Sequence, residues 1–216
     1  MAALGESDRP LTEVLAIALE RVAGLHPTCD LKNPGTPSAT VAVLREGPER
    51  FDHLVLADSP IVIERADGFV TLTDLRVDEV CQDLRSETER YATGSTEHRA
   101  AVARLVAAQR EIRNTPAGYW VAAAAPDAAA HALTGSVQRG EVRSAAVMSD
   151  GVSRLVTEYQ TASWGDVFAQ LYGEGPAAVI GSVRAVEATD PHGRRWPRYK
   201  AGDDAALAFC QRDFFG

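Results

Sequence analysis

Residues 51–74, FDHLVLADSPIVIERADGFVTLTD, constrain the fold more than any other part of this sequence. Short runs rich in Val, Ile and Leu alternate with ADSP and ADG, which have the composition of tight turns. Turns this short favour antiparallel neighbours, because a parallel pair needs a long crossover connection. We therefore predict two or three strands here, within a largely antiparallel sheet.

Further strands and helices are predicted on both sides of this segment. The predicted strands are residues 39–46 (ATVAVLRE), 118–125 (GYWVAAAA), 141–149 (EVRSAAVMS) and 205–211 (AALAFCQ). Apolar residues at helical spacing predict helices over residues 8–25, 75–92, 95–113, 163–171 and 175–188. Because strands and helices are partly segregated along the chain, the predicted fold class is α+β, layered and largely antiparallel, and not a doubly wound parallel sheet.

Several of these helices have recognisable start signals. Asp8 and Ser95 are the expected N-caps of the first and third predicted helices. Ser163 with Asp166 three residues later has the pattern of a capping box. Pro176 suits the first turn of the last helix. These signals predict where the helices begin.

Composition indicates an ordinary globular protein. The chain has 216 residues, which suits one domain, or a large fragment of one, over residues 1–216. Hydrophobic residues make up 45% and charged residues 24%, as in typical soluble domains. The formal net charge of -8 argues against nucleic acid as a partner, because such binding depends on Lys and Arg neutralising phosphates.

Cysteine usage and hydropathy predict a cytoplasmic protein. Cys29, Cys81 and Cys210 are far apart and lack CxxC spacing, so neither a disulfide framework nor a structural zinc site is expected. No stretch approaches the roughly 18 apolar residues of a membrane span. The N-terminus lacks the basic segment and apolar core of a secretory signal. We therefore expect no membrane partner.

Acidic residues recur where apolar strands meet turns. Asp58 follows HLVLA, Asp150 follows SAAVMS and precedes Gly151, and Asp203-Asp204 precedes AALAFC. Two interpretations stay open. Asp is common in turns because its side chain caps nearby backbone amides. Carboxylates at neighbouring strand ends can also converge on a hard cation such as Mg²⁺ or Mn²⁺.

Five segments together carry a family resemblance. TPSATVAVL, HLVLADSPIVIERADG, VTLTD, AAVMSDGVSRL and GDDAALAFC occur in this order along roughly residues 8–211. Their order and separations resemble the motifs of the metal-dependent protein phosphatases of type 2C. That resemblance implies a four-layer antiparallel β-sandwich flanked by helices. It also implies two Mg²⁺ or Mn²⁺ ions as cofactors, and a phosphorylated protein or small phosphomonoester as substrate.

The resemblance assigns roles to individual residues. Asp150, with Gly151, and Asp203 correspond to the segments that ligate the binuclear metal centre. Asp58 corresponds to an acidic position linked to a third metal, although Pro60 replaces the arginine usual after this motif, so a structural turn remains the competing interpretation. Asp204 would support Asp203 or a metal-bound water from outside the coordination shell.

The chain departs from the family pattern at its start. The family's early acidic strand, its metal-bridging Asp-Gly and its phosphate-binding arginine have no counterpart before residues 8–25. The expected domain is therefore N-terminally truncated. Either the gene product is incomplete, or the chain is a natural variant without the bridging ligand. No catalytic residue beyond the metal ligands is predicted.

A basic loop precedes the last predicted strand. In DPHGRRWPRYK, residues 190–200, Arg194, Arg195 and Arg198 are candidate contacts for a substrate phosphate. The competing interpretation is a solvated surface loop, as most basic loops are.

Two functions follow from these observations. The first is hydrolysis of phosphoserine or phosphothreonine esters by a water activated between two metal ions. The second is a degenerate, catalytically inactive phosphatase-like domain that acts as a protein-binding or regulatory module. Binding of Mn²⁺ distinguishes them, because only the first function requires it.

Overall fold

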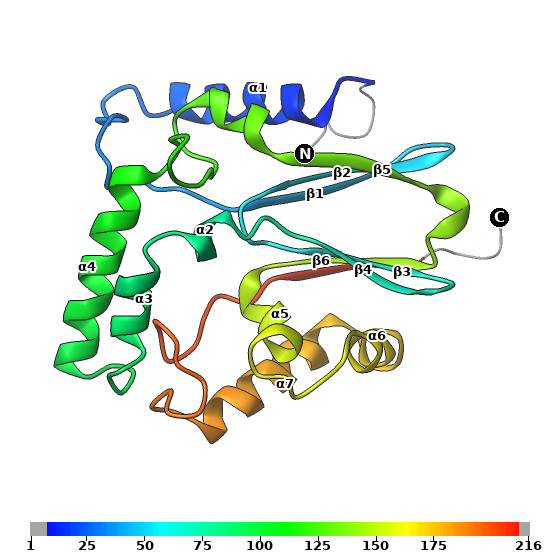
Figure 1. The fold of residues 1–216 in the computed structure, drawn as a ribbon. Helices are drawn as coiled ribbons and strands as arrows, with labels where there is room; N and C mark the ends of the chain where they lie inside the picture. Colours follow the sequence, from blue (N-terminus) through cyan, green and yellow to red (C-terminus); the bar gives the residue numbers. More distant parts are fainter. Residues whose placement is uncertain (1–7, 212–216) are drawn as a thin grey trace.

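The computed structural model describes residues 8–211, which form two antiparallel sheets packed face to face with helices outside (Figure 1). One sheet has the order β1-β2-β5, and the other has the order β4-β3-β6-β7. The strands are β1 (Val41–Glu46), β2 (Arg50–Leu56), β3 (Ile61–Arg65), β4 (Gly68–Leu72), β5 (Leu133–Gln138), β6 (Ser144–Met148) and β7 (Leu207–Gln211). The predicted α+β sandwich is confirmed.

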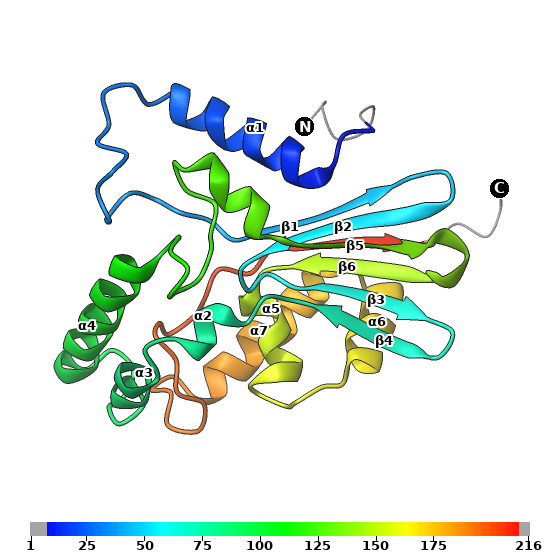
Figure 2. The ribbon, with the colours of Figure 1, turned by 45° about the horizontal axis from the view of Figure 1, so that its top comes forward.

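Helices complete the outer layers and one end of the sandwich. The α-helices are α1 (Leu11–Gly24), α2 (Arg76–Glu79), α3 (Gln82–Thr88), α4 (Thr96–Ile112), α5 (Asp150–Thr157), α6 (Trp164–Gly173) and α7 (Pro176–Thr189), and the 3-10 helices are η1 (Pro126–His131) and η2 (Arg139–Glu141). Figures 1 and 2 show α1 and η1 over the first sheet, α5 to α7 over the second, and α2 to α4 beside one end. In residues 8–211 no helix has both the length and the apolar character to cross a bilayer.

Three apolar layers explain why the strand sequences are so continuously hydrophobic. Leu54 and Leu56 of β2 pack toward α1 and η1, whereas Val55 packs between the two sheets. In β3, Ile61 and Ile63 join the layer between the sheets, and the intervening Val62 faces α5 to α7. Both faces of these strands are therefore buried, which replaces polar alternation by unbroken apolar runs.

The two short turns of residues 51–74 make different connections: one closes a hairpin and the other joins the two sheets. ADG forms the expected hairpin between β3 and β4. ADSP instead passes from β2 in one sheet to β3 in the other, with Ala57 in the left-handed region at φ 68°. The hairpin favoured there is thus not formed. The crossing brings the ends of strands from both sheets to one edge of the sandwich.

Two strand predictions differ from the structure. Residues 118–125 form no strand, and Tyr119 and Ala122 make only isolated bridges. β5 has no counterpart among the predicted strands, because its sequence LTGSVQ is almost entirely exposed and has no apolar face to signal it. Its place at the edge of the first sheet is fixed by backbone pairing with β2.

The helix boundaries follow the predicted signals in part. Ser95 caps α4 by accepting a hydrogen bond from the His98 amide at 3.0 Å, and Ser163 and Asp166 form the capping box of α6. Asp8 does not cap α1, whose N-cap is Pro10. The single helix predicted over residues 75–92 is divided into α2 and α3, because Cys81 adopts a left-handed conformation at φ 57°.

Replacing Phe168 by Ala tests the layer between the second sheet and its helices. Phe168 is buried in α6, with ring centroids 4.9 Å from Phe69 and 5.9 Å from Phe209. The cavity left by Phe168→Ala should lower the free energy of unfolding by about 3–5 kcal/mol in urea titrations. Val106→Ala on the surface of α4 is the control and should change it by less than about 0.5 kcal/mol. Equal effects would contradict this core assignment.

Candidate acidic site at the strand ends

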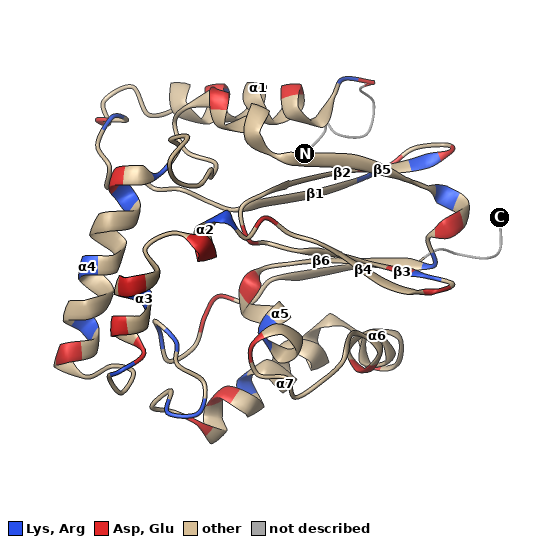
Figure 3. Ribbon diagram, in the orientation of Figure 1, with Lys and Arg blue, Asp and Glu red and all other residues tan. Residues whose placement is uncertain are grey.

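The fold brings three of the predicted acidic positions to one end of the sandwich. Asp58 lies in the turn between β2 and β3, Asp150 is the first residue of α5 directly after β6, and Asp203 lies just before β7. β6 pairs with both β3 and β7, so these positions flank adjacent strands. Figure 3 shows acidic ribbon at the start of α5 and in the segment entering β7.

A buried arginine lies between two of these carboxylates. Nη2 of Arg154 is 3.1 Å from Oδ2 of Asp150 and 3.2 Å from Oδ2 of Asp203. Its Nε lies 3.3 Å from Oε2 of Glu158. The Arg154 side chain is only 9% exposed. One guanidinium thus joins the first turn of α5 to the segment that enters β7.

Asp203 has a second cation of its own. Oδ1 of Asp203 accepts a hydrogen bond from Lys200 Nζ at 2.6 Å and from the backbone amide of Asp204 at 2.9 Å. The Asp204 carboxylate itself is fully exposed, with Lys200 3.9 Å away. Asp204 meets the site through its backbone, because its carbonyl oxygen accepts the Ser149 hydroxyl at 2.9 Å. The supporting role predicted for Asp204 stays a prediction; the group of Asp204 that contacts Asp203 is its backbone amide.

The acidic groups differ in how far their charge is neutralised. Burial, reinforced by the nearby negative charge of Asp150, raises the pKa of Asp58 to about 6. Burial also raises the pKa of Asp150, although Arg154 opposes it. Burial acts in the same direction on Asp203, but hydrogen bonds from Lys200 and from the Asp204 amide outweigh it and hold the Asp203 pKa below its usual value. Asp58 is therefore the least compensated carboxylate of the three.

The residues present do not fit the two metal ions that the sequence resemblance implies. Magnesium requires oxygen ligands at about 2.0–2.1 Å in near-octahedral geometry. Within residues 8–211, no three His, Cys, Asp or Glu side chains are grouped so that they could hold a metal ion. The carboxylate oxygens of Asp150 and Asp203 that would face such an ion instead face Arg154.

Gly151 has a packing role in this arrangement. A Cβ at residue 151 would overlap the backbone carbonyl oxygen of Asp204, so only glycine allows α5 to approach the segment before β7 this closely. Gly151→Ala should therefore lower the free energy of unfolding by about 1–3 kcal/mol, measured by urea titration.

Gly181→Ala is the matched control for that change. An added methyl at Gly181, in the interior of α7, meets open space. It should stabilise the protein by about 0.5–1 kcal/mol, because alanine is the better helix former. A neutral Gly151→Ala would show that the close approach is not required.

The basic loop is organised around one carboxylate. Asp190 accepts backbone N–H bonds from Arg194 at 2.9 Å and from Arg195 and Trp196 at 3.0 Å. Arg198 points inward with a side chain 1% exposed, and donates to the backbone carbonyls of Asp190 and Ala201. Of the three predicted phosphate contacts, Arg194 and Arg195 are exposed and Arg198 is a structural element of the loop.

Asp190→Asn should loosen this loop. The neutral amide has one acceptor oxygen in place of two and no charge to match Arg198, so we expect a loss of about 2 kcal/mol or more in the free energy of unfolding. Faster hydrogen exchange at the amides of Arg194, Arg195 and Trp196 would locate the loss. Unchanged exchange at these amides would contradict the role of Asp190.

Asp190 also gives this loop a pH dependence. Burial would raise the pKa of Asp190, but the three backbone amides and Arg198 lower it below its usual value. The stabilisation is therefore present above the ordinary pKa of about 3.9 and is lost as the pH falls through the lowered value. The stability difference between wild type and Asp190→Asn should therefore hold from neutral pH down to about pH 4 and shrink as the pH falls further.

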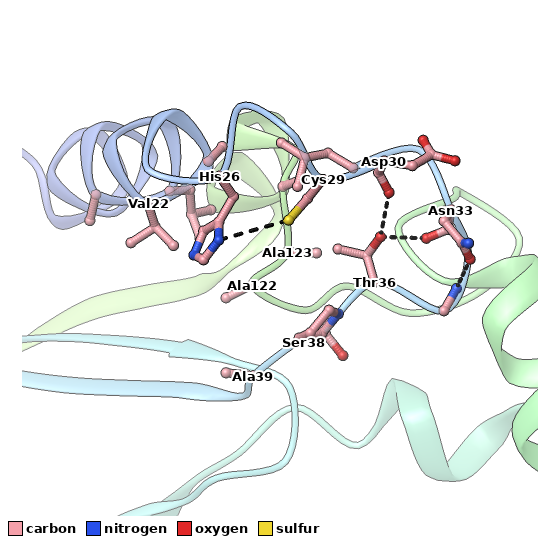
Figure 4. A pocket seen from close by; sticks show the side chains of 17 residues that line it. Val22, His26, Cys29, Asp30, Asn33, Thr36, Ser38, Ala39, Ala122 and Ala123 are labelled. Carbon is pink, nitrogen blue, oxygen red and sulfur yellow. Dashed lines mark hydrogen bonds between the residues drawn. The ribbon is translucent and has the colours of Figure 1, made fainter.

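One cavity adjoins the acidic site, and a second cavity lies away from it. One of about 450 Å³ is bounded by α3, the end of α5 and the basic loop, with Arg154 and Arg195 in its wall. A larger apolar one of about 840 Å³ lies between α1 and the loop that follows it, where Cys29 Sγ is 3.9 Å from His26 Nδ1 (Figure 4). None of the predicted site residues lines the larger cavity.

Arg154 and Glu158 were not among the predicted site residues. A signal for them was present, because Asp150, Arg154 and Glu158 follow one another at four-residue spacing, although no helix was predicted after Gly151, where the structure has α5. Side chains at this spacing meet on one helix face. The contact to Asp203 had no such signal, because it depends on where β7 lies beside β6.

Comparisons with known proteins support the fold. No family model matches the chain, and no curated protein matches it. A C. elegans sex-determining protein has a similar structure, with a TM-score of 0.54 and 12% identity over 97% of this chain and 48% of that one. This chain thus spans about half of that structure.

Serine/threonine phosphatases are also among the similar structures. Stp1 from Staphylococcus aureus has a TM-score of 0.47 and 10% identity, over 94% of this chain and 65% of that one. The catalytic domain of PstP, in complex with two manganese ions, has a TM-score of 0.48 and 15% identity, over 97% of this chain and 76% of that one. The layered α+β sandwich is established by the sheets and helices of the structure itself, and identities this low transfer no residue roles.

Proposed function

We propose that this chain is a phosphatase-like recognition module, which binds a phosphorylated protein without metal-dependent hydrolysis. The observation that carries the proposal is the position of Arg154 between Asp150 and Asp203. Two-metal hydrolysis needs both ions held close together by carboxylates. Here the same carboxylates are neutralised by side chains of the protein.

The 450 Å³ cavity beside Arg154 is the proposed recognition site. Its wall holds three carboxylates, Asp78, Glu89 and Glu158, of which Asp78 is paired with Arg85 and Glu158 with Arg154. Arg195 makes no ion pair with any residue from 8 to 211, and its guanidinium lies 4.3 Å from the centre of the Trp196 ring. An exposed guanidinium in a cavity wall suits the recognition of a phosphate group.

Tyr199 supports the same assignment. Its hydroxyl is buried in the cavity wall without a hydrogen-bond partner among the described residues. Burial raises the pKa of Tyr199 to about 12, so the hydroxyl stays a neutral donor at physiological pH. An unpartnered buried donor is costly unless a ligand or water accepts from it.

Hydrolysis is the second candidate, and one observation favours it. Asp58 and Asp150 lie near enough for the charge of Asp150 to raise the pKa of Asp58, as expected of carboxylates awaiting a cation. This candidate requires further metal ligands from outside residues 8–211. It also requires Arg154 to leave Asp150 and Asp203.

Recognition is tested by titrating phosphoserine peptide into the protein and following tryptophan fluorescence, since Trp196 lines the cavity. We expect saturable binding that Arg195→Ala weakens about tenfold, the equivalent of one charge-assisted hydrogen bond. Arg21→Ala removes an exposed arginine from the outer face of α1, so it is the charge-matched control and should bind as wild type does. Equal binding by both variants would show that this cavity is not the recognition site.

Hydrolysis is tested separately with Mn²⁺ and p-nitrophenyl phosphate. We expect wild-type turnover no higher than that of Asp150→Asn, and no tight two-site Mn²⁺ binding in calorimetry. Glu20→Gln on exposed α1 controls for the loss of one surface carboxylate. Metal-dependent turnover that Asp150→Asn abolishes would establish the hydrolase and overturn the recognition proposal.

A further inference from the structure

We infer that Arg154 is a built-in counter-cation, which neutralises Asp150 and Asp203 as a bound divalent ion would. One substitution at this position would then make the stability of the chain depend on divalent cations. The inference rests on the proposed function, because it takes the wild-type site to be complete without metal. The inference adds that Arg154 is the residue that completes the site without metal.

The contact geometry singles out Arg154. A single atom, Nη2, lies 3.1 Å from Asp150 and 3.2 Å from Asp203, which belong to different segments of the chain. Asp150 has no other ion pair within residues 8–211. The guanidinium therefore occupies the point at which the two carboxylates converge, as a shared ion would.

Lys200 cannot take over this role. It contacts Asp203 on the other carboxylate oxygen, Oδ1, and its side chain is 57% exposed. It makes no ion pair with Asp150 among the described residues. Without Arg154, Asp150 would face the Asp203 carboxylate with no positive charge in contact.

Burial makes the missing charge consequential. The Asp203 side chain is only 14% exposed, so water screens its charge poorly. The Asp150 side chain is 37% exposed and thus partly screened, but the Asp203 carboxylate facing it is still destabilised unless one of the two takes up a proton or a cation enters. An uncharged side chain of similar length, such as Met, would leave a gap with two carboxylates in its wall. One or two carboxylates together with water are the usual ligands of Mg²⁺.

Thermal unfolding with EDTA or with millimolar Mn²⁺ tests the inference. The midpoint of the wild type should be the same in both. Arg154→Met in EDTA should unfold several degrees lower, because Asp150 loses its ion pair while Asp203 keeps only Lys200. Mn²⁺ should raise the midpoint of Arg154→Met by several degrees, because only the folded state gathers the ligands.

Two further variants separate cation binding from general effects. Arg154→Lys keeps the positive charge and should remain insensitive to Mn²⁺. Arg154→Met combined with Asp203→Asn removes one ligand and should lose the Mn²⁺ response. If Arg154→Met is insoluble without metal, its refolding yield from urea with and without Mn²⁺ gives the same comparison.

The outcomes distinguish this inference from the proposed function. If Mn²⁺ changes neither the midpoint nor the refolding yield of Arg154→Met, Arg154 is not a counter-cation of this kind, and the recognition proposal stands. If wild type responds to Mn²⁺ as strongly as Arg154→Met does, the inference is overturned. If that wild-type response comes with hydrolysis, the recognition proposal falls as well.

Discussion

The stacking of the two sheets through one shared apolar layer is the constraint on which the rest of the structure depends. Val55 from β2 and Ile61 and Ile63 from β3 are fully buried in that layer, although β2 and β3 belong to different sheets. The connection between these strands must therefore cross from one sheet to the other within a few residues. That crossing fixes Asp58 at the end of the sandwich where β6 also ends.

The same edge explains why carboxylates gather there. The fully buried stretches of β2 and β3 contain only apolar residues, since an unpaired charge there would be too costly, so charged groups lie beyond them. Asp150 begins α5 directly after β6, so its charge also lies at a helix N-terminus, where negative charge is favoured. Asp203 approaches from the segment before β7. The acidic site is thus a consequence of strand order as much as of residue type.

Local chemistry explains which predictions from sequence succeeded. The α+β class, most strands, and the capping of α4 and α6 depend on apolar spacing and on side chains close in sequence, and these were predicted correctly. β5 was missed because its residues are mostly exposed and pair only through the backbone. The break at Cys81 and the crossing at Ala57 depend on left-handed backbone conformations at residues other than glycine, which carry little sequence signal.

The acidic site, like the fold, was predicted only in part from the sequence. The positions of Asp58, Asp150 and Asp203 at strand ends could be inferred, because each follows or precedes an apolar run. What holds two of them together could not be inferred fully. Arg154 lies in register with Asp150 and Glu158 on one helix, but its contact with Asp203 requires β7 to lie beside β6. Motif order alone thus suggested a metal where the packing supplies an arginine.

An arginine and a divalent ion satisfy two carboxylates in different ways. A guanidinium is attached to the chain, so its presence needs no ion from solution, and its planar donors direct hydrogen bonds at fixed angles. It cannot activate a coordinated water as a metal ion does. Arg154 therefore engages the carboxylates of Asp150 and Asp203, and the adjoining cavity keeps the exposed Arg195 in its wall. The proposal of recognition without turnover rests on that substitution of one cation for another.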